Sequence, residues 1–167
     1  GLRPKDTDWV VVGSSPEEMI KKGFKQVGKD FPVFLHPNTN EEYALARKDR
    51  KTGVGHKDFQ FNFSPDVTLE EDLERRDLTI NSMALDENGN LIDPFNGAKD
   101  IENKCFRPVS QAFFEDPLRA LRVARFKAQF PEFFLHESME QALFKTSASN
   151  ELLNLSSERV WGEVVKG

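Results

Sequence analysis

The chain has 167 residues, of which 38% are hydrophobic and 31% are charged, a composition typical of a globular protein and not of a disordered chain. Its formal net charge of −5 excludes a general attraction to nucleic acid, so any contact with RNA or phosphate requires a local basic patch. The single cysteine, Cys105, excludes an internal disulfide and favours a reducing cytoplasm, and without a signal peptide or an apolar run of about 18 residues no membrane insertion is expected.

The first part of the chain is predicted to mix strands and helices. The β-branched run at residues 8–13 predicts a strand. A helix is expected to follow, with Ser15 as its N-cap, Pro16 in its first turn and Glu18 reaching back as a capping box. This helix is predicted to end at Gly23. Further strands are predicted at residues 24–28, 33–37, 42–48 and 59–63, with a basic, glycine-containing loop at 47–58.

The middle of the chain is predicted to contain a helix, a hairpin and a last strand. Thr68 is the expected N-cap of a helix over residues 69–76, whose acidic start and basic end suit the helix dipole. Residues 83–93 predict a hairpin with Asn88-Gly89 at its tip, and residues 105–109 a strand. The remainder is predicted to be helical, at residues 115–130, 137–145 and 156–165. Strands with interspersed helices, then helices alone, indicate an α+β fold.

Two carboxylates stand directly at the start of the first strand. Asp6 and Asp8 flank Thr7, and in an extended chain residues two apart point to the same face. Such a pair can hold a divalent metal through its oxygens, and the metal removes the repulsion between the like charges. Two other interpretations stay open at this point: solvated turn residues, and the D-x-D motif of a glycosyltransferase.

A row of arginines follows a second acidic pair. Arg119, Arg122 and Arg125 recur at a spacing of three after Asp116 and Pro117. Each step turns by about 300° on a helix, so the arginines form a slowly drifting stripe, on which Asp116 and Arg119 are neighbours that can pair. An anion lying across the stripe would offset the repulsion between the guanidinium groups. The alternative is a solvated helix face with salt bridges inside the helix.

Four segments of the chain together resemble a known family. They are KDTDWVVVG, EEDLERRDLTINSMALDENGNLIDPFNG, FFEDPLRALRVARF and LSSERVWGEV. In order and spacing they resemble the motifs of class II tRNA nucleotidyltransferases, the CCA-adding enzymes, whose relatives include bacterial poly(A) polymerases. The resemblance implies a DNA-polymerase-beta-like nucleotidyltransferase head, a mixed sheet with helices, over residues 1–109, and the start of a helical neck over residues 110–167.

The resemblance also implies a reaction and its partners. A CCA-adding enzyme extends a tRNA that lacks its 3′ CCA, using CTP and ATP in a metal-assisted nucleotidyl transfer. Asp6 and Asp8 would be the catalytic residues and would hold Mg²⁺, and Arg76 of the R-R-D motif would contact the nucleotide. The basic loop around residues 51–57 would correspond to the loop that helps the family switch from C to A.

The arginine helix acquires a role in base selection by the same resemblance. Asp116 and Arg119 match the E-D-x-x-R motif, which in the family acts as an amino-acid template that reads the Watson–Crick edges of CTP and ATP. A carboxylate can accept from an exocyclic amine while a guanidinium donates to a ring nitrogen or carbonyl. Arg122 and Arg125 match further arginines of the family's nucleotide site.

Other readings of the chain define what has to be tested. The family's glycine-rich loop, body and tail are not in the sequence, so we expect it to be an incomplete part of an enzyme. A poly(A) polymerase of the same family and a non-catalytic nucleotide- or RNA-binding fragment are the alternatives.

Asp93 is expected to stabilise the turn at residues 93–97. His36, His56 and His136 lack ligand spacing, so no zinc site is expected.

Overall fold

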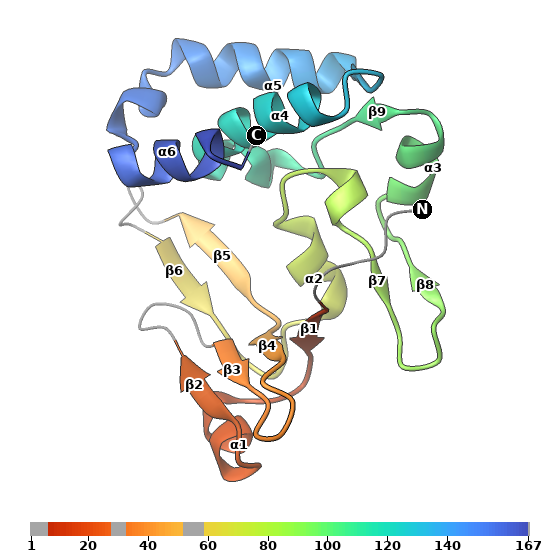
Figure 1. Ribbon diagram of the computed structural model, residues 1–167, viewed down its shortest axis with the longest axis vertical. Helices are drawn as coiled ribbons and strands as arrows, with labels where there is room; N and C mark the ends of the chain where they lie inside the picture. Colours follow the sequence, from red (N-terminus) through yellow and green to blue (C-terminus); the bar gives the residue numbers. More distant parts are fainter. Residues whose placement is uncertain (1–6, 28–32, 52–58, 167) are drawn as a thin grey trace. The chain divides into compact units, whose positions relative to one another are not determined.

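The computed structural model describes residues 7–27, 33–51 and 59–166 (Figure 1). The chain divides into two compact units. The sheet unit comprises residues 1–50 and 60–72, and the helical unit comprises residues 51–59 and 73–167. Helices and small sheets occur together, which confirms the predicted α+β class. The division into a head at residues 1–109 and a neck at residues 110–167 stays a prediction.

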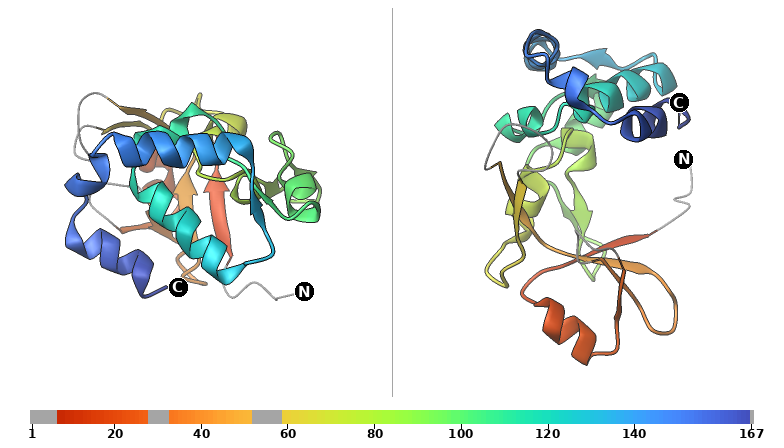
Figure 2. Two further views of the ribbon diagram at one scale, coloured as in Figure 1. Left: turned by 90° about the horizontal axis from the view of Figure 1, so that it is seen from above. Right: turned by 90° about the vertical axis from the view of Figure 1, so that its left-hand side faces the viewer.

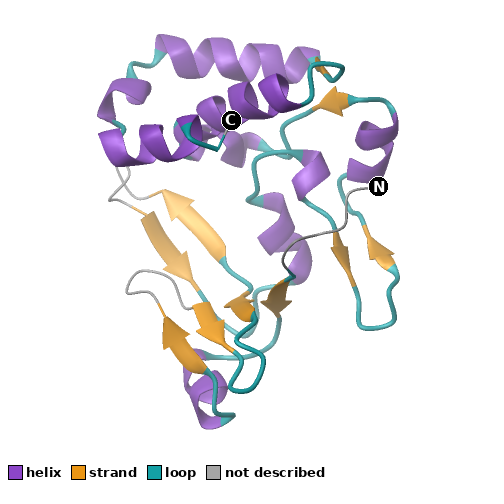
Figure 3. Cartoon of the chain, viewed as in Figure 1, coloured by secondary structure: helices purple, strands orange, loops and turns teal. Residues whose placement is uncertain are grey.

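The sheet unit is built on a mixed four-stranded sheet (Figure 3). Its strand order is β1-β4-β3-β2, with β1 parallel to β4 and the other neighbours antiparallel. Helix α1 (Pro16–Lys21) contributes Met19 to a buried cluster with Phe34 and Leu45 of the sheet. The four strands confirm the predictions with shorter bounds: Asp8–Val11 (β1), Lys25–Val27 (β2), Val33–Leu35 (β3) and Glu42–Leu45 (β4).

The start of α1 follows the predicted cap only in part. The Ser15 hydroxyl accepts a hydrogen bond from the Glu18 amide at 3.3 Å, as an N-cap does. The Glu18 carboxylate, however, accepts from the Ser14 hydroxyl at 2.9 Å and does not close the predicted box onto Ser15. Gly23 follows the helix with a φ of +88°, a left-handed conformation that glycine adopts without steric cost.

The prediction of a basic loop at residues 47–58 is wrong for residues 48–51. Residues Lys48–Lys51 form strand β5, which pairs with β6 (Phe59–Asn62) in a two-stranded sheet. Because the stretch is rich in lysine and arginine, composition alone suggested a loop, although pairing with the alternating strand β6 satisfies its backbone. Residues 52–58 lie outside the described part of the chain.

Helix α2 (Leu69–Glu74) begins as predicted and ends earlier. The Thr68 hydroxyl accepts from the Glu71 amide at 3.2 Å, and the Glu71 carboxylate accepts from the Thr68 amide at 3.1 Å, a complete capping box. The helix stops before Arg75 and Arg76, whose carbonyls instead accept hydrogen bonds from Arg119. A tertiary contact therefore ends this helix, which local propensity extends to residue 76.

The helical unit combines the predicted hairpin with a group of helices. Helix α6 packs against helix α4, as both views of Figure 2 show. Residues 115–130, predicted as one helix, are divided between η2 and α4, and α3 and β10 were not predicted. The elements are η1 (Thr79–Asn81), β7 (Ala84–Leu85), β8 (Leu91–Ile92), α3 (Gly97–Glu102), β9 (Cys105–Phe106), η2 (Gln111–Glu115), α4 (Leu118–Gln129), β10 (Phe134–Leu135), α5 (Glu137–Ala148), η3 (Glu151–Asn154) and α6 (Ser157–Val164).

A hydrophobic core joins β9, η2, α4 and α5. Phe106 of β9, Phe113 of η2 and Val123 of α4 are almost completely buried, and Met139 and Ala142 of α5 pack into the same cluster. Strand β9 pairs in parallel with β10, so the chain returns beside β9 before α5 begins. The core thereby fixes the start of α4, where the predicted template residues lie.

Asp93 stabilises the turn before α3, as predicted. Its two carboxylate oxygens accept from the amides of Gly97 at 2.7 Å and Ala98 at 2.9 Å, the first donors of the helix. Gly97 has no space for a side chain, since an added Cβ would lie 2.2 Å from the Thr79 carbonyl oxygen. The described helices include none that is long and apolar enough to cross a membrane.

Replacing Asp93 with alanine should therefore lower the free energy of unfolding by about 1–2 kcal/mol, the usual cost of a lost helix cap. Urea unfolding of the full-length protein measures this change. Asp93→Asn, which keeps one carbonyl acceptor, should lose less. Equal stability of wild type and Asp93→Ala would show that other donors and acceptors replace the cap.

Candidate functional site

Asp8 is the first residue of β1 and its side chain is exposed. The Asp8 side chain makes no hydrogen bond or ion pair in the described part of the chain, so its carboxylate oxygens are available to a ligand. Asp6, its predicted partner, lies outside the described residues. The described residues alone contain no group of three or more His, Cys, Asp or Glu arranged to hold a metal.

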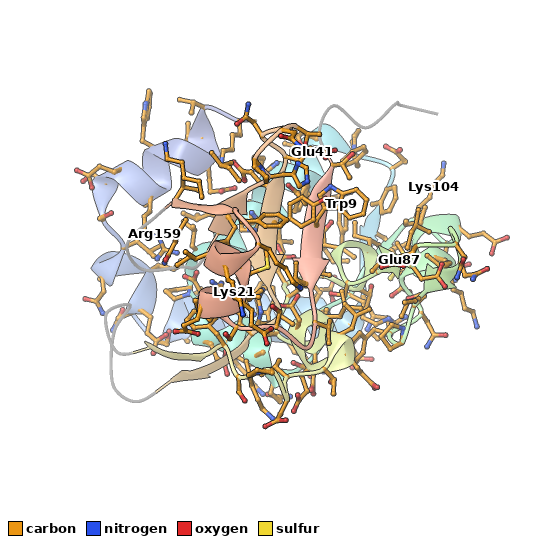
Figure 4. All side chains as sticks on the ribbon, turned by 90° about the horizontal axis from the view of Figure 1, so that it is seen from below. Trp9, Lys21, Glu41, Glu87, Lys104 and Arg159 are labelled. Carbon is orange, nitrogen blue, oxygen red and sulfur yellow. The ribbon has the colours of Figure 1, made fainter. Side chains whose placement is uncertain are left out.

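Glu42 is a neighbour of Asp8 that the sequence analysis missed. It is the first residue of β4 and stands in register with Asp8 across the parallel β1–β4 pair. Residues in register share a face of the sheet, and both side chains are exposed. On the opposite face the next pair, Trp9 and Tyr43, stacks its rings at 5.5 Å, and Figure 4 labels Trp9 on this strand.

The donor chemistry of this sheet edge fits a divalent cation. Two carboxylates side by side repel one another, and a hard cation with oxygen preference removes that cost. The signal that could have found Glu42 is its position at the start of a strand, as for Asp8. Only the parallel pairing of two strands distant in sequence brings the two residues together.

In the R-R-D segment, Asp77 and not Arg76 is the buried residue. The Arg76 guanidinium is half-buried and donates to the Asn81 carbonyl at 3.0 Å. The Asp77 side chain is only 6% exposed and pairs with Arg122 Nε at 2.7 Å. Burial alone raises the pKa of Asp77, but the charge of Arg122 and hydrogen bonds from Arg122, Asn81 and the Leu78 amide outweigh it and hold the pKa below its usual value.

This ion pair predicts a pH dependence of stability. Because the folded pKa of Asp77 is lowered, the stabilisation is fully present above the unfolded pKa of about 3.9 and is lost as the pH falls through the lower folded value. Asp77→Asn should cost about 2 kcal/mol at neutral pH, less than a fully buried pair because Arg122 is partly exposed.

Thermal unfolding of the full-length wild type and Asp77→Asn across the pH range checks this prediction. The difference between the two proteins should be constant at neutral pH and shrink below about pH 4. A difference that persists undiminished in acid would mean that the Asp77 charge does not stabilise the fold.

Arg119 holds the start of α4 to the R-R-D segment. Its guanidinium donates to the carbonyl oxygens of Ala112 and Arg75, both at 2.6 Å, and more weakly to that of Arg76 at 3.5 Å. Charged donors to backbone carbonyls are among the stronger hydrogen bonds in proteins. Two of the predicted nucleotide-site residues, Arg76 and Arg119, are therefore neighbours in space.

Asp116 pairs with a residue that the sequence analysis did not select. The predicted neighbour, Arg119, donates to the backbone carbonyls named above, and the Asp116 carboxylate instead accepts from Arg159 Nη2 of α6 at 2.7 Å. Figure 4 labels Arg159. The other Asp116 oxygen accepts from the Leu118 amide at 3.1 Å. The Asp116 side chain remains 23% exposed, so it keeps a surface that a ligand can reach.

The remaining arginines of α4 are paired with other elements. Arg125 Nε donates to Glu163 of α6 at 2.8 Å, and Arg122 Nη1 lies 4.0 Å from the same carboxylate. Both the Arg125 and Glu163 side chains are largely buried, at 13% and 7% exposure. These contacts between elements replace the salt bridges within the helix that were the alternative expectation. Nucleotide contacts of Arg122 and Arg125 stay predictions.

Comparisons with known proteins give a consistent result. The profile of the Poly A polymerase head domain matches residues 1–107. The Multifunctional CCA protein of Aromatoleum aromaticum is 59% identical over 168 residues, which cover 100% of this chain and 41% of that relative. The chain thus spans about two fifths of the length of such relatives.

Two solved structures share the fold. The CCA-adding enzyme of Bacillus stearothermophilus in complex with CTP matches with a TM-score of 0.74 and 31% identity, over 97% of this chain and 39% of that one. The Thermotoga maritima CCA-adding enzyme complexed with tRNA matches with a TM-score of 0.68 and 26% identity, over 97% of this chain and 38% of that one.

Proposed function

The chain belongs to the poly A polymerase head-domain family, and from this premise we propose that the whole protein is a CCA-adding tRNA nucleotidyltransferase. It adds C, C and A to the 3′ end of a tRNA, using CTP and ATP. The observation that carries the proposal is the 59% identity, along the entire chain, to a relative named Multifunctional CCA protein. The complexes of similar enzymes with CTP and with tRNA support the proposed substrates.

The proposed chemistry takes place at the β1 edge of the sheet unit. The family implies a divalent metal, and we propose Mg²⁺ held by Asp6, Asp8 and Glu42, since hard carboxylate oxygens suit this ion. When bound, the metal would neutralise triphosphate charge and stabilise the charge that develops during nucleotidyl transfer. Asp8 and Glu42 contribute fixed negative charge from the ends of two paired strands, which holds their spacing constant.

Base selection is assigned to the start of α4. The Asp116 carboxylate oxygens accept hydrogen bonds, so they favour the exocyclic amines of cytosine and adenine. Uracil and guanine present a carbonyl oxygen at the matching place, where two acceptors would face each other without a proton. Arg119 is proposed to supply the donor of the template, and Arg76, its neighbour, to contact phosphate or sugar.

Arg122 and Arg125 take a supporting role in this proposal. Each is paired with a carboxylate of another element, Asp77 or Glu163, and such pairs hold α4 in place. Their remaining donors can still face the nucleotide. Arg122 and Arg125 raise the affinity for all four nucleotides by a similar amount. The choice of base lies with Asp116 and Arg119.

The proposal is tested with the full-length protein and a tRNA transcript that ends before its CCA. With CTP and ATP together, the reaction should stop after one C-C-A has been added to each transcript, as read on a sequencing gel. A long tail of A would identify the poly(A) polymerase of the same family. If the folded full-length protein does not extend the transcript, the alternative of a non-catalytic nucleotide- or RNA-binding protein is favoured instead.

A further inference from the structure

We propose that Arg159 of α6 is a positioning residue for base selection, because it fixes the direction in which Asp116 accepts a hydrogen bond. The inference rests on the proposed function and adds a residue to it. Both oxygens of the Asp116 carboxylate are held, one by the Leu118 amide at 3.1 Å and the other by Arg159 Nη2 at 2.7 Å. A carboxylate held at both oxygens cannot rotate, and its free lone pairs keep one orientation.

The Arg159 guanidinium is itself committed to this contact. Its side chain is 24% exposed, and its Nη1 atom is buried without a hydrogen-bond partner among the described residues. A buried donor without an acceptor is unfavourable. The arrangement is therefore not the one that best satisfies Arg159 alone, whereas it places Nη2 against Asp116 at the distance of a strong charged hydrogen bond.

Two contacts hold helix α6, and with it Arg159, in place. Ser156 caps the helix by accepting from the Arg159 amide at 3.5 Å, directly at the residue concerned. One turn later, the buried Glu163 pairs with Arg125 of α4 at 2.8 Å. Helix α6 thus pairs with Asp116, just before α4, through Arg159, and with Arg125 and Arg122 of α4 through Glu163. The Asp116 side chain is still 23% exposed and within reach of a ligand, whereas the Arg125–Glu163 pair is largely buried.

Asp116 and Arg159 thus have different roles in base recognition. Asp116 would contact the base, and Arg159 would act through Asp116 without touching the nucleotide. Freed from Arg159, the carboxylate can turn, and it then tolerates a carbonyl oxygen where an amine is required. Loss of Arg159 should therefore affect the choice between bases more than the affinity for the triphosphate.

The test compares kcat/KM for CTP and UTP in the full-length protein, on a tRNA lacking its CCA. Arg159→Met, which keeps much of the side-chain length without the charge, should lower the preference for CTP over UTP by about 10- to 100-fold, the range expected when the Asp116 carboxylate turns and loses its polar contact to the base. Arg159→Lys, which keeps a positive donor but not the planar fork, should fall between Arg159→Met and wild type. Its intermediate value also guards against a fold defect in Arg159→Met.

Two controls separate positioning from structure. Glu158→Gln changes the exposed neighbour on α6 and should leave the preference unchanged. In an Asp116→Ala background, Arg159→Met should alter the preference no further, because the residue through which it acts is absent. An additional loss there, or an equal slowing of CTP and UTP by both Arg159 variants, would overturn the inference.

The outcomes also distinguish this inference from the proposed function. If wild-type protein shows no preference for CTP over UTP, the proposed function fails. If wild type prefers CTP and both Arg159 variants retain the full preference, the function stands and the role of Arg159 is refuted.

Discussion

Replacing Asp8 with alanine in the full-length protein should lower the incorporation of both CTP and ATP by about a thousandfold or more. A catalytic metal contributes several kcal/mol of transition-state stabilisation, and each 1.4 kcal/mol, roughly, is a factor of ten in rate. Both nucleotides should be affected equally, because the metal acts on the triphosphate and not on the base. Single-turnover extension of a tRNA lacking its CCA measures the effect.

Folding should survive this change, because the Asp8 side chain is exposed and makes no hydrogen bond or ion pair with the described residues. Thermal unfolding of Asp8→Ala should match wild type, and Glu42→Gln should show a smaller loss of activity in the same direction. Substantial activity in Asp8→Ala would contradict the assignment of the metal site to this edge of the sheet.

Replacing Arg119 with alanine should have the second largest effect. We expect kcat/KM for CTP and ATP to fall by about 10- to 100-fold and the values for UTP and GTP to fall less, since a template donor contributes only to correct pairs. The variant also frees the carbonyls of Arg75 and Ala112 that Arg119 holds, which adds a loss of stability that thermal unfolding detects.

Measuring kcat/KM for all four nucleotides separates these two contributions. Arg119→Lys, which retains the charge but cannot reach several carbonyls at once, is the matched control and should keep part of the affinity while losing discrimination. If Arg119→Ala slows all four nucleotides by the same factor, Arg119 is a structural brace and another residue supplies the donor.

Local patterns were sufficient to predict much of the fold. The caps at Ser15 and Thr68 and the hairpin with Asn88-Gly89 at its tip rest on contacts between residues close in sequence, which is why they could be predicted. Strand β5 was missed because its basic composition resembles a loop, whereas pairing with the next strand, β6, decides its state.

The candidate site depended more on tertiary structure. The resemblance selected Asp8, Asp116 and Arg119, but the sequence could not indicate that Glu42 stands in register with Asp8 or that Arg159 binds Asp116. Each of these pairs joins residues more than thirty positions apart, and no local periodicity reports such a contact. The same holds for the pairing of Arg125 with Glu163.

In the proposed function, side chains of the protein choose the base. The most direct test gives each nucleotide singly to the full-length wild type, once with a tRNA lacking its CCA and once with a tRNA ending in C-C. We predict that CTP alone extends the first tRNA, that ATP alone extends the second by one residue, and that UTP and GTP extend neither at comparable rates. Incorporation of all four nucleotides with similar kcat/KM would contradict it.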